Sequence, residues 1–251
     1  MAVTRPLCRA MSLLAAALLG AVCHAADASP LFAAASALAD DAKQSWYTHR
    51  LEIDPANHRY GLDCSGFVSL VLERQAPDAL TAIPKIAGKT RRLAADFHDA
   101  FAAAATTAQP GAWQRIVRLA DLQPGDLIAW DHPDHAAGED TGHIVFVAAA
   151  PLAEPHACWR IRVLDCTSTP HGNDHRTAGT GGIGQGTMWF TAGADGAPAS
   201  LHWASLEHPA KIWPIALARW VPATGTVALP AADPKPRTSD QPAVTTPREQ
   251  D

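Results

Sequence analysis

The stretch Asp63-Cys64-Ser65-Gly66-Phe67-Val68 is the most informative part of this 251-residue chain. An acidic residue directly before an apolar run predicts a helix that begins at Asp63, whose side chain caps free backbone amides, and that ends before Pro77. Cys64 would then lie in the first helical turn, where the positive end of the helix dipole favours a thiolate. The thiolate is the nucleophilic form of cysteine, so the segment predicts a catalytic thiol. The alternative is an inert cysteine in a core helix.

Helical patterns come first along the chain, and strand-like patterns follow. Besides the helix at Asp63, we expect helices over residues 31–49 and 89–105, the second with Lys89, Arg91 and Arg92 on a solvated face. Short apolar runs separated by Gly, Pro, Asp and His then predict strands at residues 126–130, 144–147, 159–165, 188–191, 201–204 and 215–220. Asp195-Gly196 is a turn signal between two of them. This order indicates an α+β fold, with N-terminal helices packed on an antiparallel sheet.

Both ends of the chain differ from the middle in composition. Arg5 and Arg9, the apolar run 11–22 and the small residues that follow it are typical of a signal peptide. We therefore expect residues 1–25 to be removed on export to the periplasm or the extracellular space. The apolar run is shorter than the roughly 20 residues that span a bilayer, so we expect no stable membrane insertion after cleavage. Residues 26–45 are expected to form a helical lead-in, and the Pro- and Thr-rich residues 222–251 a disordered tail.

Charge and cysteine content limit what the mature chain can bind. Without residues 1–25, 18 basic residues face 25 acidic ones, so the formal charge falls from −5 to −7. This argues against nucleic acid as a partner, because proteins that bind nucleic acid present a basic face.

Of the three remaining cysteines, Cys158 and Cys166 are separated by a predicted strand that holds them beyond the roughly 7 Å limit for a disulfide, so we expect both to be small core residues. We expect a monomer with one catalytic domain, residues 46–221.

Three segments occur in a fixed order along the chain: Asp63-Cys64-Ser65-Gly66-Phe67-Val68, Leu122-Gln123-Pro124-Gly125-Asp126-Leu127 and Gly142-His143-Ile144-Val145-Phe146-Val147. In this order they resemble the successive signatures of the NlpC/P60 family of cysteine peptidases. The resemblance extends over roughly residues 46–221. It implies a papain-like core and an activity on peptides of bacterial cell walls.

The resemblance assigns the general base to His143, which opens the strand after the Gly-Asp-Leu strand. An imidazole with a pKa near 6.5 is suited to accept the thiol proton and return it to a leaving amine. The family places a third, orienting residue on the next strand, at the position of Asp165. Strand alternation turns Asp165 to the face opposite its two neighbours, where a carboxylate would fix one tautomer of the histidine. His171 is the competing candidate for this role.

Acyl transfer also needs hydrogen-bond donors for the oxyanion, and the backbone amide of Cys64 is the first candidate. Tyr60 lies just upstream, where members of the family often carry a site tyrosine in a Tyr-x-x-Gly-Gly run. Only Tyr60-Gly61 of that run is present. We consider Tyr60 and Ser65 as oxyanion or site-lining residues. For Tyr60 the alternative is an aromatic side chain that packs under the loop.

Three further patterns give weaker indications of a ligand. Residues 179–184 satisfy G-x-G-x-x-G, but a dinucleotide site needs a strand before and a helix after this pattern. We expect a mobile loop beside the cleft instead, and no cofactor. The His- and acid-rich segment 131–140, and the pair His171 and His175, lack the spacing of a zinc motif, so we expect no metal. Residues 131–141 are expected to form a rim loop that shapes specificity.

The sequence thus predicts a cysteine hydrolase that cleaves amide bonds, most of all in peptidoglycan stem peptides, as an endopeptidase or an amidase. Cys64, His143 and Asp165 would form the triad, and the intermediate would be a thioester acyl-enzyme. Peptidoglycan or another peptide would be the substrate. Two alternatives stay open: a catalytically silent cell-wall binding or scaffolding module, and a hydrolase of another amide or thioester, since one fold hosts many substrates.

Overall fold

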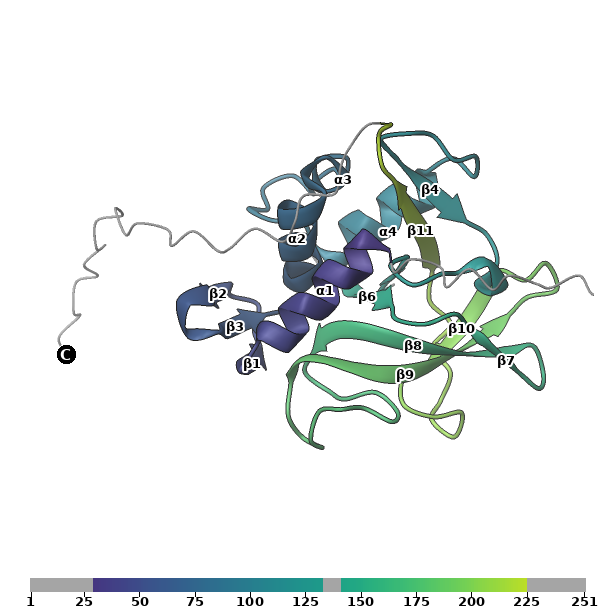
Figure 1. Cartoon of the computed structure of the whole chain (residues 1–251). Helices are drawn as coiled ribbons and strands as arrows, with labels where there is room; N and C mark the ends of the chain where they lie inside the picture. Colours follow the sequence, from purple (N-terminus) through teal and green to yellow (C-terminus); the bar gives the residue numbers. More distant parts are fainter. Residues whose placement is uncertain (1–28, 133–140, 225–251) are drawn as a thin grey trace, which may run out of the picture.

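The computed structural model describes residues 29–132 and 141–224 of the chain (Figure 1). The predicted signal peptide and residues 225–251 of the predicted tail lie outside the described residues. Most of the predicted rim loop, residues 133–140, also lies outside them. In the part of the chain that is described, no helix is long and apolar enough to cross a membrane.

The chain folds into a mixed α+β structure, as the sequence predicts. The helices are α1 (Pro30–Asp41), α2 (Cys64–Gln75), α3 (Pro77–Thr81) and α4 (Ala94–Ala103). The first three strands form a small sheet in the order β1-β3-β2, with β1 (Gln44–Tyr47), β2 (Glu52–Asp54) and β3 (Arg59–Leu62). In this sheet β1 pairs with β3 in parallel, and β2 pairs with β3 in antiparallel fashion.

The remaining strands form a larger antiparallel sheet in the order β10-β9-β8-β6-β5-β11-β4, and β7 pairs with β8. Their bounds are β4 (Ala112–Ile116), β5 (Leu127–Asp131), β6 (Gly142–Val147), β7 (Leu152–Glu154), β8 (Cys158–Thr167), β9 (Gly182–Ala192), β10 (Pro198–His202) and β11 (Ile215–Val221). The turn predicted at Asp195-Gly196 joins β9 to β10, and Gly196 has a φ of 84° there. Cys64, Cys158 and Cys166 are buried free thiols, which confirms the core positions predicted for Cys158 and Cys166.

The helices cover one face of the larger sheet. Helix α2 contacts β6 and β8, α4 contacts β5, β6 and β11, and α1 packs on α2 (Figure 1). Alternation along β5 divides the core between the two faces. Leu127 and Ala129 belong to the helix-covered cluster, whereas Ile128 and Trp130 belong to the cluster on the opposite face.

Helix α2 begins where the sequence predicts. Asp63 is its N-cap, and one carboxylate oxygen of Asp63 accepts a hydrogen bond of 2.7 Å from the amide of Gly66. Phe67, one turn into the helix, is fully buried and meets Phe146 of β6 with ring centroids 5.9 Å apart. Because this contact fixes the first turn of α2 against β6, it also fixes Cys64 beside that strand.

Two helix predictions are wrong at their boundaries. The helix expected over residues 31–49 ends at Asp41, because residues 44–47 pair instead with β3, a partner distant in sequence. The helix expected over residues 89–105 begins at Ala94, and Arg91 and Arg92 precede it. These two arginines are not on a solvated face: Arg92 donates to the carbonyl of Ile83, and Arg91 forms an ion pair with Asp63.

The expectation of a mobile loop over residues 179–184 is wrong for the second half of that segment, because residues 182–184 belong to strand β9. Gly182, Gly184 and Gly186 belong to β9, which pairs with β8 from Thr167 to Cys158. A Cβ at Gly184 would lie 2.7 Å from the side chain of Arg176, and a Cβ at Gly186 would lie 2.5 Å from a carboxylate oxygen of Asp174. The glycines therefore make room for residues 170–176 to lie against the sheet.

Candidate active site

Cys64 lies at the N-terminus of α2 with its side chain almost fully buried. Burial raises the pKa of its thiol well above the ordinary value, and the nearby carboxylate of Asp63 raises it further. Backbone amides of Ile144 and Ser65 contact the sulfur and act in the opposite direction. The sequence predicts a lowered thiol pKa from the helix dipole alone. Tertiary burial outweighs that dipole in the protein as it stands without substrate.

His143 is the second residue of β6, directly before the residue whose amide contacts the thiol. Its Nε2 donates a hydrogen bond of 2.6 Å to Oδ2 of Asp165. Within the described residues, His143 forms no hydrogen bond through Nδ1. With Nε2 committed to Asp165, the Nδ1 edge is the part of the ring that can exchange a proton with a reacting group.

Asp165 lies on β8 and is completely buried. Its neighbours Leu164 and Cys166 belong to the helix-covered core, so strand alternation turns Asp165 toward His143, as the sequence predicts. Burial alone would disfavour its ionised form. The imidazoles of His171 and His143, which both donate to it, nevertheless hold the pKa of Asp165 well below its ordinary value. The residue that accepts a hydrogen bond from His143 is thus Asp165, whereas His171 meets His143 only ring to ring.

His171 contacts Asp165 from the other side. Its Nε2 donates to the same Oδ2 atom over 2.9 Å, and its Nδ1 is buried with no hydrogen-bond partner among the described residues. A proton on Nε2 satisfies the contact with Asp165, whereas a buried N–H at Nδ1 would have no acceptor there. The ring of Trp203 packs on both imidazoles, with centroid distances of 4.4 Å to His171 and 5.2 Å to His143.

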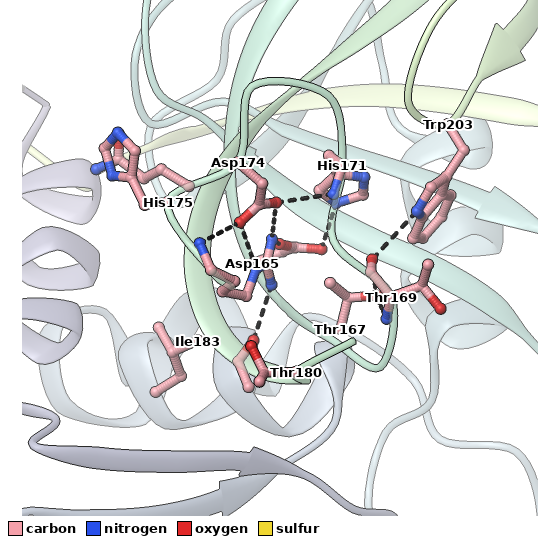
Figure 2. Close-up of polar contacts among 12 residues, drawn as sticks. Asp165, Thr167, Thr169, His171, Asp174, His175, Thr180, Ile183 and Trp203 are labelled. Atoms are coloured by element: carbon pink, nitrogen blue, oxygen red, sulfur yellow. Dashed lines mark hydrogen bonds and ion pairs between the residues drawn. The ribbon is translucent and has the colours of Figure 1, made fainter. Parts of the chain in front are cut away.

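Arg176 and Asp174 hold this arrangement together. Figure 2 shows Asp174 beside Asp165 and His171. Arg176 donates to Oδ1 of Asp165 over 2.9 Å and to both carboxylate oxygens of Asp174 over 2.8 Å. Asp174 also accepts a 2.8 Å hydrogen bond from the amide of His171. Neither Arg176 nor Asp174 was predicted from the sequence. Their short spacing next to His171 was the available signal, but their contact with Asp165 depends on the glycines of β9.

The structure places the two tentative oxyanion residues differently. Tyr60 is fully buried, and its hydroxyl donates a 2.6 Å hydrogen bond to Asp41 of α1. Burial, and then this hydrogen bond, raise the pKa of Tyr60. Tyr60 therefore packs beneath the site, which is the alternative reading of this residue. Ser65 does line the pocket beside Cys64, where it donates to Asp63 and accepts from Arg91.

Two adjacent pockets meet at Tyr47 and Gly142, which line both. The first has a volume of about 220 Å³ and includes Cys64; the other residues that line it include Asp63, Ser65, His49, Lys89, Arg91 and Thr141. The second has a volume of about 250 Å³ and includes His143; the other residues that line it include Trp130, Thr167, Trp203, Lys211 and Trp213. The nucleophile candidate and the base candidate thus open into neighbouring halves of one cleft.

The two halves differ in chemistry. The half at Cys64 is polar and charged, whereas the half at His143 carries three tryptophans, and the ammonium of Lys211 lies 5.3 Å from the ring of Trp203 and 4.4 Å from that of Trp213. The cleft positions of Tyr47, Arg91 and Lys211 were not predicted from the sequence. Tyr47 ends strand β1, and Arg91 and Lys211 lie in two segments outside the named helices and strands, so no local motif marks them.

The side chains of His143, Asp165 and His171 could in principle hold a metal ion, since one ligand atom from each lies within 4.8 Å of the others. Two imidazoles and a carboxylate are a donor set that suits zinc. Here both Nε2 atoms donate to one carboxylate oxygen, and the guanidinium of Arg176 occupies the other. These hydrogen bonds account for the whole cluster, and the adjacent guanidinium disfavours a further cation.

Comparison with known proteins gives one match to this chain at the level of sequence. No family model matches the sequence, and no solved structure matches it. The chain is similar to uncharacterized protein R653 of Acanthamoeba polyphaga mimivirus, with 28% identity over 159 residues that cover 56% of this chain and 67% of the viral protein.

Proposed function

We propose that this protein is an exported cysteine hydrolase with a papain-like NlpC/P60 core that cleaves amide bonds in peptidoglycan stem peptides. Cys64 is the nucleophile, His143 the general base and Asp165 the residue that orients it. The observation that carries the proposal is the 2.6 Å hydrogen bond from Nε2 of His143 to the buried carboxylate of Asp165. The residue after His143 on strand β6 is Ile144, and its backbone amide contacts the thiol of Cys64.

The proposed reaction uses these three residues in sequence. The sulfur of Cys64 attacks the amide carbonyl as its proton passes to Nδ1 of His143, and Asp165 stabilises the imidazolium. The backbone amide of Cys64 is the proposed donor to the oxyanion. The imidazolium then protonates the leaving amine as the C–N bond breaks, which leaves a thioester on Cys64. Water attacks the thioester with His143 again as base, and the acid product and free thiol are released.

The raised pKa of the Cys64 thiol determines the step of this scheme at which the thiol loses its proton. Because burial disfavours a free thiolate, proton transfer to His143 accompanies attack on a bound substrate instead of preceding it. In the absence of substrate, Cys64 should therefore alkylate slowly with iodoacetamide at pH 6. Slow alkylation at that pH does not distinguish an enzyme from a silent module, so a test of function must measure turnover.

Mass spectrometry of purified sacculi after incubation with the mature protein tests the proposal. We expect new muropeptides with wild type and none with Cys64→Ala. Cys158→Ala is the matched control, since Cys158 is also a buried free thiol but lies at the far end of β8 from Asp165. Identical muropeptide profiles from wild type and Cys64→Ala would overturn peptidoglycan as the substrate.

The burial of Cys64 also favours one alternative, a silent module that binds cell walls without cutting them. This alternative requires that wild type and Cys64→Ala sediment equally with sacculi and that neither releases any fragment. Sedimentation together with Cys64-dependent fragments would exclude it.

A further inference from the structure

The pocket beside Cys64 has an excess of positive charge. Its lining includes one carboxylate, Asp63, and two permanent cations, Lys89 and Arg91. Asp63 is buried, and both oxygens of its carboxylate already have partners. One of its oxygens accepts hydrogen bonds from Gly66, Ser65 and Arg91, and the other pairs with Arg91 and His49. Asp63 and Arg91 therefore offset each other.

Lys89 supplies the charge that is left over. Its ammonium forms no ion pair or hydrogen bond with any residue in the described ranges 29–132 and 141–224. Arg91 retains a side-chain exposure of 21%, so its outer edge can also reach the pocket. A half-buried lysine without a carboxylate partner among the described residues, in a pocket whose one described acid is neutralised, creates a positive potential that favours an anion.

We propose that this pocket is an anion-binding subsite that holds a carboxylate of the substrate, with Lys89 as its principal charge and Arg91 at its wall. The carboxylate lies on the acyl side of the scissile bond. His143 opens into the other half of the cleft, and it protonates the leaving amine, so the leaving part lies in that half. The acyl part then remains beside Cys64, next to Lys89.

The substrate assignment rests on the proposed function, but the subsite itself can be tested without a substrate. Iodoacetate and iodoacetamide alkylate a thiol by the same displacement of iodide and differ in charge. The rate constant for iodoacetate divided by that for iodoacetamide at Cys64, measured by mass spectrometry at pH 9 in low salt, therefore reports on nearby charge. We expect this ratio to be about tenfold lower in Lys89→Met than in wild type, the effect of one partly screened unit charge several ångströms away.

Lys85→Met is the matched control, because Lys85 is an exposed lysine of the same loop that does not line the pocket. It should retain the wild-type ratio, and 1 M salt should lower the wild-type ratio toward that of Lys89→Met. Equal ratios in wild type and Lys89→Met would overturn the subsite and leave the proposed nucleophile intact. Failure of Cys64 to react with either reagent at pH 9 would contradict a subsite that admits a carboxylate beside the thiol, and the proposed nucleophile would still be decided by turnover.

Turnover tests the substrate assignment. We expect the mature protein to prefer stem-peptide fragments with free carboxylates over the same fragments converted to carboxamides. Lys89→Met should raise KM about tenfold for the free form, leave kcat nearly unchanged and have little effect on the amidated form. Cleavage of both forms with equal KM would contradict this inference alone, whereas cleavage of neither form would contradict the proposed function.

Discussion

His143 and Asp165 meet where strands β6 and β8 have stopped pairing. The two strands are in register at Phe146–Leu164 and Val147–Val163, and the 2.6 Å hydrogen bond between the two side chains lies beyond that ladder. The separation of the strands leaves space for an imidazole between them. Trp203 packs on this imidazole, and a second imidazole, His171, approaches the same carboxylate. The candidate base is therefore held from several sides before any substrate binds.

Asp165→Asn should remove most of the activity. An asparagine can contact the imidazole but cannot stabilise its charged form, and we expect kcat to fall by about 10²- to 10⁴-fold. The release of muropeptides under saturating substrate measures this effect. Glu207→Gln, at an exposed position, is the control and should match wild type. A kcat within threefold of wild type for Asp165→Asn would remove Asp165 from the mechanism.

The same carboxylate should make stability depend on acid pH. The pKa of Asp165 is held well below its ordinary value in the folded protein. A carboxyl group with a lowered folded-state pKa contributes stability above its unfolded-state pKa, and that stability is lost as the pH falls through the folded-state value. Wild type should thus exceed Asp165→Asn by about 3 kcal/mol at pH 7, and the difference should shrink below about pH 4. Urea denaturation between pH 7 and pH 2.5 measures it, and a constant difference would contradict the assignment.

His171 is expected to act as a positioning residue through Asp165. In His171→Leu, Asp165 loses one of its two imidazole donors and is held less firmly by His143 and Arg176 alone, which should lower kcat by about ten- to hundredfold with little change in KM. His171→Gln, which can still donate to the carboxylate, should recover part of the loss. If both variants lose stability and activity equally, His171 has only a structural role.

Gly186→Ala should disturb the site from the neighbouring strand. The added Cβ would lie 2.5 Å from a carboxylate oxygen of Asp174 and 2.6 Å from Cβ of His171. We expect a loss of about 1–3 kcal/mol in the free energy of unfolding, as for other overpacked positions, together with reduced activity. Gly193→Ala is the control, since its Cβ would meet the flexible end of the Asp195 side chain at 3.1 Å. Equal stability of the two variants would show that residues 170–176 can move away from β9.

The sequence by itself determined the start of α2, the α+β order of elements and the residues on which the chemistry is proposed to rest. These features depend on local rules: an acidic N-cap before an apolar run, and alternation along β8 that turns Asp165 away from Leu164 and Cys166. Only the tertiary structure decided which groups surround those residues. Arg91 and Arg176 reach their carboxylates from loops 28 and 11 residues away in sequence, and no local pattern encodes such contacts. The thiol pKa was decided in the same way, because the dipole of α2 is a property of the helix, whereas the burial that outweighs it is produced by strands that arrive much later in the chain.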